Sequence, residues 1–81
     1  MKVTQYFLTT RTRSDRQSIE DMWIEATILN PDAVHIQHDG RIRKWKKIEA
    51  AGNRYLRVVL LEDGETVHNA FFDRRFQEKE I

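Results

Sequence analysis

The stretch Tyr55–Phe72, with the sequence YLRVVLLEDGETVHNAFF, decides the fold expected of this chain. Two runs rich in aliphatic, β-branched and aromatic residues flank Asp63-Gly64, a preferred pair for a two-residue hairpin turn. With these two residues as the loop, Glu62 lies opposite Glu65, and the pairing of both strands follows. The stretch therefore predicts an antiparallel hairpin in which Asp63 and Gly64 both have positive φ.

This register predicts which side chains share a face, because successive residues of a strand point to opposite sides of the sheet. One face is expected to form the core, and it carries Leu56, Val58, Leu60, Val67, Asn69 and Phe71. The other face carries Tyr55, Arg57, Val59, Leu61, Thr66, His68, Ala70 and Phe72. On this second face Arg57 is diagonal to His68, within reach of a long side chain.

A second hairpin is expected from Val34 to Ile48, with a two-residue turn at Asp39-Gly40. The same pairing rule places Val34, Ile36 and Trp45 on the apolar side. The other side carries His35, Gln37, Ile42, Lys44, Lys46 and Ile48. If the two hairpins are neighbours, His35, Lys44, Lys46, Tyr55, Arg57 and His68 share one exposed sheet surface.

The first part of the chain is expected to supply a strand and a helix. Val3–Thr10 is rich in β-branched and aromatic residues, which favours a strand. Ser14 and Gln17 have the spacing of a capping box, and apolar residues including Trp23 then recur at helical spacing until Asn30-Pro31. The predicted fold is α+β: one main helix, about Ser14 to Leu29, packed on an antiparallel sheet of four to five strands. The order is strand, helix, meander.

Composition narrows the class of protein. The 81 residues, 40% of them hydrophobic, predict a single domain spanning residues 1–81. There is no cysteine and no apolar run long enough to span a bilayer, so a cytoplasmic location without membrane contact is expected. No metal site or cofactor is expected, because His35 and His38 point to opposite sides of a strand and no phosphate-binding loop is present. Residues 73–81 are expected to form a short helix or a frayed tail.

The charges are segregated although the net charge is only +1. Residues 41–57 contain seven basic residues and one acid, whereas residues 19–32 contain four acids and no base. Such an asymmetry favours a polyanion such as RNA as the partner. The alternative is a solvated surface whose strand lysines prevent pairing between sheet edges.

The order of elements resembles the BrnT-like and RelE-like toxin group and related small bacterial domains of unassigned function. The similarity covers about Ser14 to Arg75 and rests on Leu29-Asn-Pro-Asp32, the basic strand after Gly40, and Arg57-Val-Val59. It implies a sheet face that contacts messenger RNA, with Arg57, Arg74 and Arg75 at the basic positions, and an antitoxin-like protein partner. The chain has Arg11-Thr12-Arg13 where many BrnT-like members have a Lys-His pair.

Three functions are compatible with these patterns. The first is a toxin-like, metal-independent endoribonuclease in which His68 moves a proton, Tyr55 assists, and Arg57 stabilises the developing charge. Its nucleic-acid contacts would be Lys44, Lys46, His35, Arg74 and Arg75. The second is an RNA- or protein-binding module without chemistry. The third is a homodimer formed through apolar residues of the exposed sheet face, such as Val59.

Overall fold

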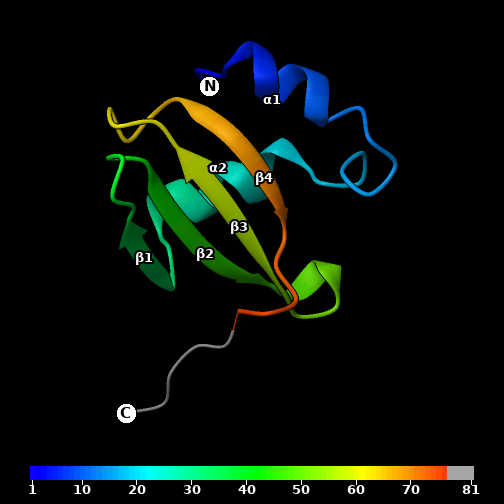
Figure 1. Cartoon of the computed structure of the whole chain (residues 1–81). Coiled ribbons are helices and arrows are strands. Elements are labelled where there is room, and N and C mark those ends of the chain that lie inside the picture. The colour runs from blue at the N-terminus through cyan, green and yellow to red at the C-terminus, as the bar shows by residue number, and fades with distance from the viewer. Residues whose placement is uncertain (77–81) are drawn as a thin grey trace.

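The computed structural model describes residues 1–76. Two helices, α1 (Gln5–Thr10) and α2 (Asp21–Leu29), precede four strands, and a short 3₁₀ turn, η1 (Glu49–Ala51), lies between the second and third of these. The strands are β1 (Ala33–Ile36), β2 (Ile42–Ile48), β3 (Arg54–Leu60) and β4 (Val67–Phe72). They form one antiparallel sheet in the order β1-β2-β3-β4, with α2 behind it and α1 beside β4 (Figure 1). The predicted α+β class and four-stranded meander are confirmed.

The prediction of a strand over Val3–Thr10 is wrong, because most of this segment is helix α1. The Thr4 side chain caps that helix by accepting a hydrogen bond from the amide of Phe7 at 3.1 Å. Phe7 is then buried at 2% exposure against the sheet. Only Val3 keeps a strand-like pairing, as a single parallel bridge to Val67. The cap and the burial of one aromatic ring outweigh the β propensity of the segment.

The predicted helix Ser14–Leu29 is too long at its start. Residues 11–18 form turns, and α2 begins at Asp21 after the extended cap residue Glu20. The capping box does not form, because the amide of Gln17 donates to the carbonyl of Arg13 and its side chain donates to the carbonyl of Thr12. The end of the helix at Leu29, just before Asn30-Pro31, is as predicted.

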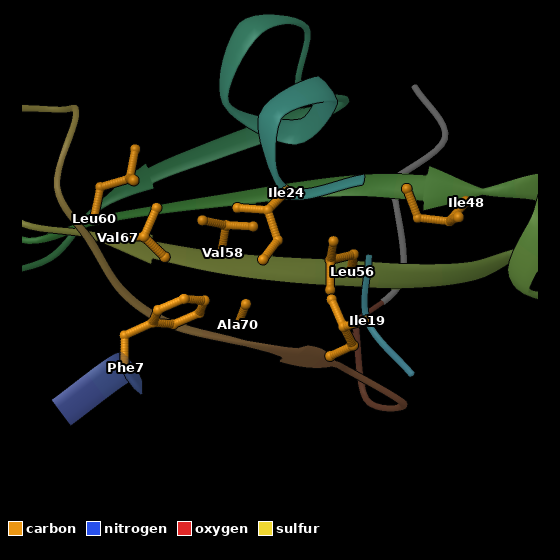
Figure 2. Packing of buried hydrophobic residues seen from close by; sticks show 9 residues of the cluster. All are labelled: Phe7, Ile19, Ile24, Ile48, Leu56, Val58, Leu60, Val67 and Ala70. Atoms are coloured by element: carbon orange, nitrogen blue, oxygen red, sulfur yellow. The ribbon is translucent and has the colours of Figure 1, made fainter. Parts of the chain in front are cut away.

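The core lies between α2, α1 and one face of the sheet. Figure 2 shows Ile24 of α2 and Phe7 of α1 among strand residues, and the cluster consists of Phe7, Ile19, Ile24, Ile48, Leu56, Val58, Leu60, Val67 and Ala70. The alternation Leu56, Val58, Leu60 confirms the predicted core face of β3. Trp23 is only half-buried and packs edge-on against Phe72, with ring centroids 6.2 Å apart.

The turn between β1 and β2 differs from the prediction by one residue. The amide of Gln37 donates to the carbonyl of Arg41, so His38, Asp39 and Gly40 form a three-residue loop. Gly40 has a φ of 90°, whereas Asp39 does not have positive φ. A turn followed by a left-handed glycine is the usual form of such a loop. Because the side-chain period of a strand is two, this single extra residue turns every side chain of β2 to the face opposite to the predicted one.

The turn between β3 and β4 keeps the predicted pairing but not the predicted shape. Leu61 pairs with Thr66, as expected, around a four-residue loop in which Asp63 accepts hydrogen bonds from the amides of Glu65 and Thr66. Of the two predicted left-handed residues, only Gly64 has positive φ. A β-bulge at Val59/Leu60 then shifts the register, so Val67 and Ala70 are both buried and two residues lie between them. Four residues of β4 therefore lie on the face opposite to the predicted one. Ala70 and Phe72 are on the core side, and Asn69 and Phe71 are on the other side.

Candidate nucleic-acid interface

We call the sheet surface opposite α2 the open face. Its members follow from strand alternation and register, since their neighbours along each strand belong to the core. They are Arg43, Trp45 and Lys47 of β2, Tyr55, Arg57 and Val59 of β3, and Asn69 and Phe71 of β4. Figure 1 views the sheet from this side. The open face therefore combines arginine, lysine and aromatic side chains.

Arg57 lies at the centre of the open face, between two aromatic rings. It is the cross-strand partner of both Trp45 and Phe71. Its guanidinium carbon is 5.7 Å from the Trp45 ring centroid and 5.1 Å from that of Phe71. These distances fit cation–π contacts, which hold the planar guanidinium in place.

Asp73, just after β4, fixes this arrangement. Its Oδ2 accepts hydrogen bonds from the indole Nε1 of Trp45 at 3.1 Å and from the guanidinium of Arg57 at 3.3 Å. Burial alone would raise the pKa of Asp73, but the Trp45 hydrogen bond, the amide of Arg75 and the charge of Arg57 together lower it. The carboxylate is therefore ionised at neutral pH, and it neutralises one of the cations on this face.

The positive charge on the open face exceeds what Asp73 neutralises. Burial lowers the pKa of Arg57, and the nearby charge of Arg43 lowers it further. Arg43 itself donates to the side-chain oxygen of Gln37, a neutral acceptor, at 2.8 Å. Lys47 is exposed on the same face, opposite Tyr55. Two close guanidinium groups and one lysine make this surface favourable for a polyanion.

The ring of Phe76 covers the end of the open face at which Tyr55 lies. Phe76 stacks on Trp45 with ring centroids 4.7 Å apart, and its ring is 5.0 Å from that of Tyr55. Trp45 is thereby buried to 8% exposure, as predicted, but under Phe76 rather than under α2. The predicted position of Trp45 on the helix side is wrong. The one-residue difference in the β1–β2 turn explains the error.

His68 occupies the bulge of β4, at the opposite end from Tyr55. Its Nδ1 is 3.1 Å from the Thr4 hydroxyl, and its ring stacks on Tyr6 at 4.7 Å. Burial, with a smaller effect from Arg41, lowers the pKa of His68 below its ordinary value of 6.5. Arg57, which was predicted to lie diagonal to His68, lies opposite Phe71 instead.

The three residues proposed for catalysis are thus not gathered at one point. The amide of Asp73 donates to the carbonyl of Tyr55, and His68 lies five residues before Asp73 on β4. At the rise of a strand this separation is about 15 Å. Tyr55 and His68 therefore cannot both touch one phosphate in this arrangement.

Lys44 and Lys46 lie on the helix side of the sheet, so their predicted place on the open face is wrong. Lys44 Nζ donates to the carbonyl of Ile28 at 2.8 Å, and Lys46 Nζ donates to the carbonyl of Asn30 at 2.9 Å. Both carbonyls belong to the C-terminal end of α2, where the helix dipole is negative and carbonyls need partners. These two lysines stabilise the end of the helix.

The other predicted nucleic-acid contacts are on the surface. His35 is exposed on β1, on the open-face side opposite Arg43. Arg74 and Arg75 are exposed in the turn that follows Asp73, and the amide of Arg75 donates to that carboxylate. All three lie at the margin of the open face and not at its centre.

The sequence did not predict the open-face positions of Arg43, Lys47 and Phe71, nor the contact of Arg16 with this face. Arg16 comes from the turn segment before α2 and donates to Asn69 at 2.6 Å, with its guanidinium 5.1 Å from the Phe71 ring. No local pattern predicts this contact between residues 53 positions apart. Arg43, Lys47 and Phe71 were visible as alternating basic and aromatic strand residues, but on the wrong face.

Comparisons with known proteins give no relative for this chain. No family model matches it, and no curated protein and no solved structure matches it either. Within residues 1–76, no three histidine or carboxylate side chains are gathered in a way that could hold a metal ion. In the same part of the chain, neither helix is long and apolar enough to cross a membrane.

Proposed function

We propose that the chain is an RNA-binding module that takes single-stranded RNA on its open face. The observation that carries the proposal is the Arg57 guanidinium held between Trp45 and Phe71, with Arg43 as an adjacent cation. A side chain fixed in this way loses little conformational freedom on binding, which favours affinity. Lys47 adds an exposed cation on the same strand face.

Single strands fit this surface better than duplexes. The open face is a sheet of four strands, about 14 Å across at the usual strand spacing, which suits two or three nucleotides. Unpaired bases stack on aromatic rings and on arginine planes, both of which the open face offers. The half-buried Phe71 and Tyr55 are the rings on which bases would stack.

The test is the salt dependence of binding to a fluorescein-labelled 15-nucleotide RNA, measured by anisotropy. Each phosphate contact adds about 0.7 to the slope of log K against log salt for a single strand. The double variant Arg43→Gln, Lys47→Gln should therefore bind more weakly and lower the slope by about 1.4. The matched control Lys44→Gln, Lys46→Gln alters the same strand on the opposite face and should keep the parent slope. Equal slopes for the parent and the first variant would contradict the proposal.

Cleavage of the bound RNA, as by a toxin-like endoribonuclease, is a second candidate, and His68 favours it. Its lowered pKa leaves the imidazole neutral at pH 7, as a general base requires. In the tautomer whose Nδ1–H donates to the Thr4 hydroxyl, Nε2 is the nitrogen that can take a substrate proton. Attack of an RNA 2′-hydroxyl on the adjacent phosphate needs such a base and no metal.

The variant His68→Gln tests this candidate in the presence of EDTA. Glutamine keeps hydrogen bonding but cannot move a proton at pH 7, so cleavage should be lost while RNA affinity changes by no more than a few-fold. The parent rate should rise with pH through a midpoint below 6.5, because the neutral form is the base. Parent protein that does not cut RNA, or a variant that cuts at the parent rate, would remove the role of His68 and leave the binding proposal intact.

A further inference from the structure

The two edge strands of the sheet, β4 and β1, differ in how far other parts of the chain cover them. The β4 edge is protected by α1, by the Val3–Val67 bridge, by the bulge and by Arg16. Arg16 reaches around this edge, since it lines a small cavity with Phe7 and Ala70 on the core side and contacts Phe71 on the open face. The β1 edge has no such cover among residues 1–76, because β1 lies at the edge of the sheet and pairs with β2 alone (Figure 1). Its residues Val34, His35 and Ile36 are exposed.

The backbone of β1 offers hydrogen bonds at this edge. The amide of Gln37 donates toward β2, to the carbonyl of Arg41. Because the direction of backbone groups alternates along an antiparallel strand, His35 also bonds toward β2, and Val34 and Ile36 direct their N–H and C=O groups outward. Protected edges usually carry a charge, a proline or a bulge, and the segment Ala33–Ile36 has no acid, lysine, arginine or proline.

On the helix side, this edge is apolar. Val34 and Ile36 are 54% and 68% exposed, and Leu29 at the end of α2 is 84% exposed. Val34 and Ile36 lie on the same side of β1, and Leu29 belongs to the end of α2 that Lys44, the partner of Val34, contacts through the carbonyl of Ile28. A strand added at this edge would place every second side chain against this apolar group.

On the open-face side, cations of β2 lie next to this edge, and the exposed Asp32 just before β1 accepts a hydrogen bond from the amide of Lys47. His35 lies on the edge itself, Arg43 is its partner on β2, and Lys47 is exposed further along that strand. We infer that β1 accepts an extended segment of another protein in which apolar and acidic residues alternate. Its apolar residues would meet Val34 and Ile36, and its carboxylates would meet His35 and Arg43.

A second copy of this chain fits the edge less well. In the register that pairs Val34 with Ile36 of the copy, the two His35 side chains meet, with both Arg43 side chains beside them. Charge complementarity therefore favours an acidic strand over self-association. The β1 edge adjoins the surface proposed to take RNA and shares Arg43 with it, but the outward backbone groups of Val34 and Ile36 belong to the edge alone.

The probes are three capped peptides: Ser-Val-Glu-Val-Glu-Val-Ser, the same peptide with lysine in place of glutamate, and a scrambled glutamate peptide. Titration of the ¹⁵N-labelled chain at low salt should shift and broaden the amides of Val34 and Ile36 with the glutamate peptide. Its affinity should exceed that of the other two at least tenfold. Equal binding of the glutamate and lysine peptides would overturn the inference, as would no binding.

The variant Val34→Pro removes an outward amide without removing a bond to β2, and proline is tolerated at such edge positions. It should weaken binding of the glutamate peptide about five- to tenfold, whereas Val34→Thr, which keeps the amide, should weaken it less. Equal affinity of the proline variant and the parent would contradict strand addition. Protection of the Val34 amide that grows with protein concentration, without peptide, would assign the edge to a second copy instead.

Discussion

The two faces of β2 carry the same kind of side chain for different purposes. Lys44 and Lys46 on the helix side bond to carbonyls at the end of α2. Arg43 and Lys47, at alternate positions of the same strand, belong to the open face, where Asp73 is the carboxylate that contacts the central arginine. The difference teaches that a basic strand is not by itself a nucleic-acid site. The partner of each cation decides whether it stabilises the fold or is available to a ligand.

The largest expected effect is in stability, and it separates the buried core of the helix side from the exposed β1 edge on the same side. Ile24 on the core side is 1% exposed, so Ile24→Ala should lower the free energy of unfolding by about 2–5 kcal/mol, through lost burial and the cavity left behind. The matched change Ile36→Ala removes the same atoms from a residue that is 68% exposed, and it should cost less than about 0.5 kcal/mol. Urea unfolding of both variants provides the measurement. Equal costs would mean that the core side is wrongly assigned.

A smaller difference in stability is expected between two double variants of β2, one for each face of the strand. Lys44→Gln, Lys46→Gln removes two charged donors from the end of α2 and should cost about 1 kcal/mol of stability, because such caps and dipole contacts are worth about 0.3–1 kcal/mol each. Arg43→Gln, Lys47→Gln should change stability by less than half as much. Thermal unfolding at two salt concentrations gives both values. The reverse order would contradict the assigned roles of the two faces.

The sequence predicted the architecture better than the site. The meander, the end of α2 at Asn30-Pro31 and the core face of β3 follow from hydrophobic alternation and turn residues, which are local signals. The face of β2 depended on whether the loop at Asp39-Gly40 has two or three residues, and both forms use glycine with positive φ. One extra residue in that loop places Lys44 on the helix side, where it was not expected, and Arg43 on the open face.

Two further errors come from contacts distant in sequence. The bulge at Val59/Leu60 follows from no local pattern, and it brings Ala70 into the core and Phe71 onto the open face. The N-terminal helix depends on the Thr4 cap and on burial of Phe7 against β4, which outweigh the strand propensity of Val3–Thr10. Tertiary packing decides such segments, and a single sequence shows it only indirectly.

The most direct test of the central claim is a ¹H–¹⁵N NMR titration of the chain with an eight-nucleotide single-stranded RNA. RNA on the open face should shift the Trp45 indole Nε1–H, the Arg43 and Arg57 side-chain Nε–H signals, and the amides around Phe71. The amides of α2, from Asp21 to Leu29, should keep their positions, because the sheet separates them from the ligand. Shifts confined to α2 and the Lys44 and Lys46 side chains, or no shifts at RNA concentrations up to the millimolar range, would contradict the account.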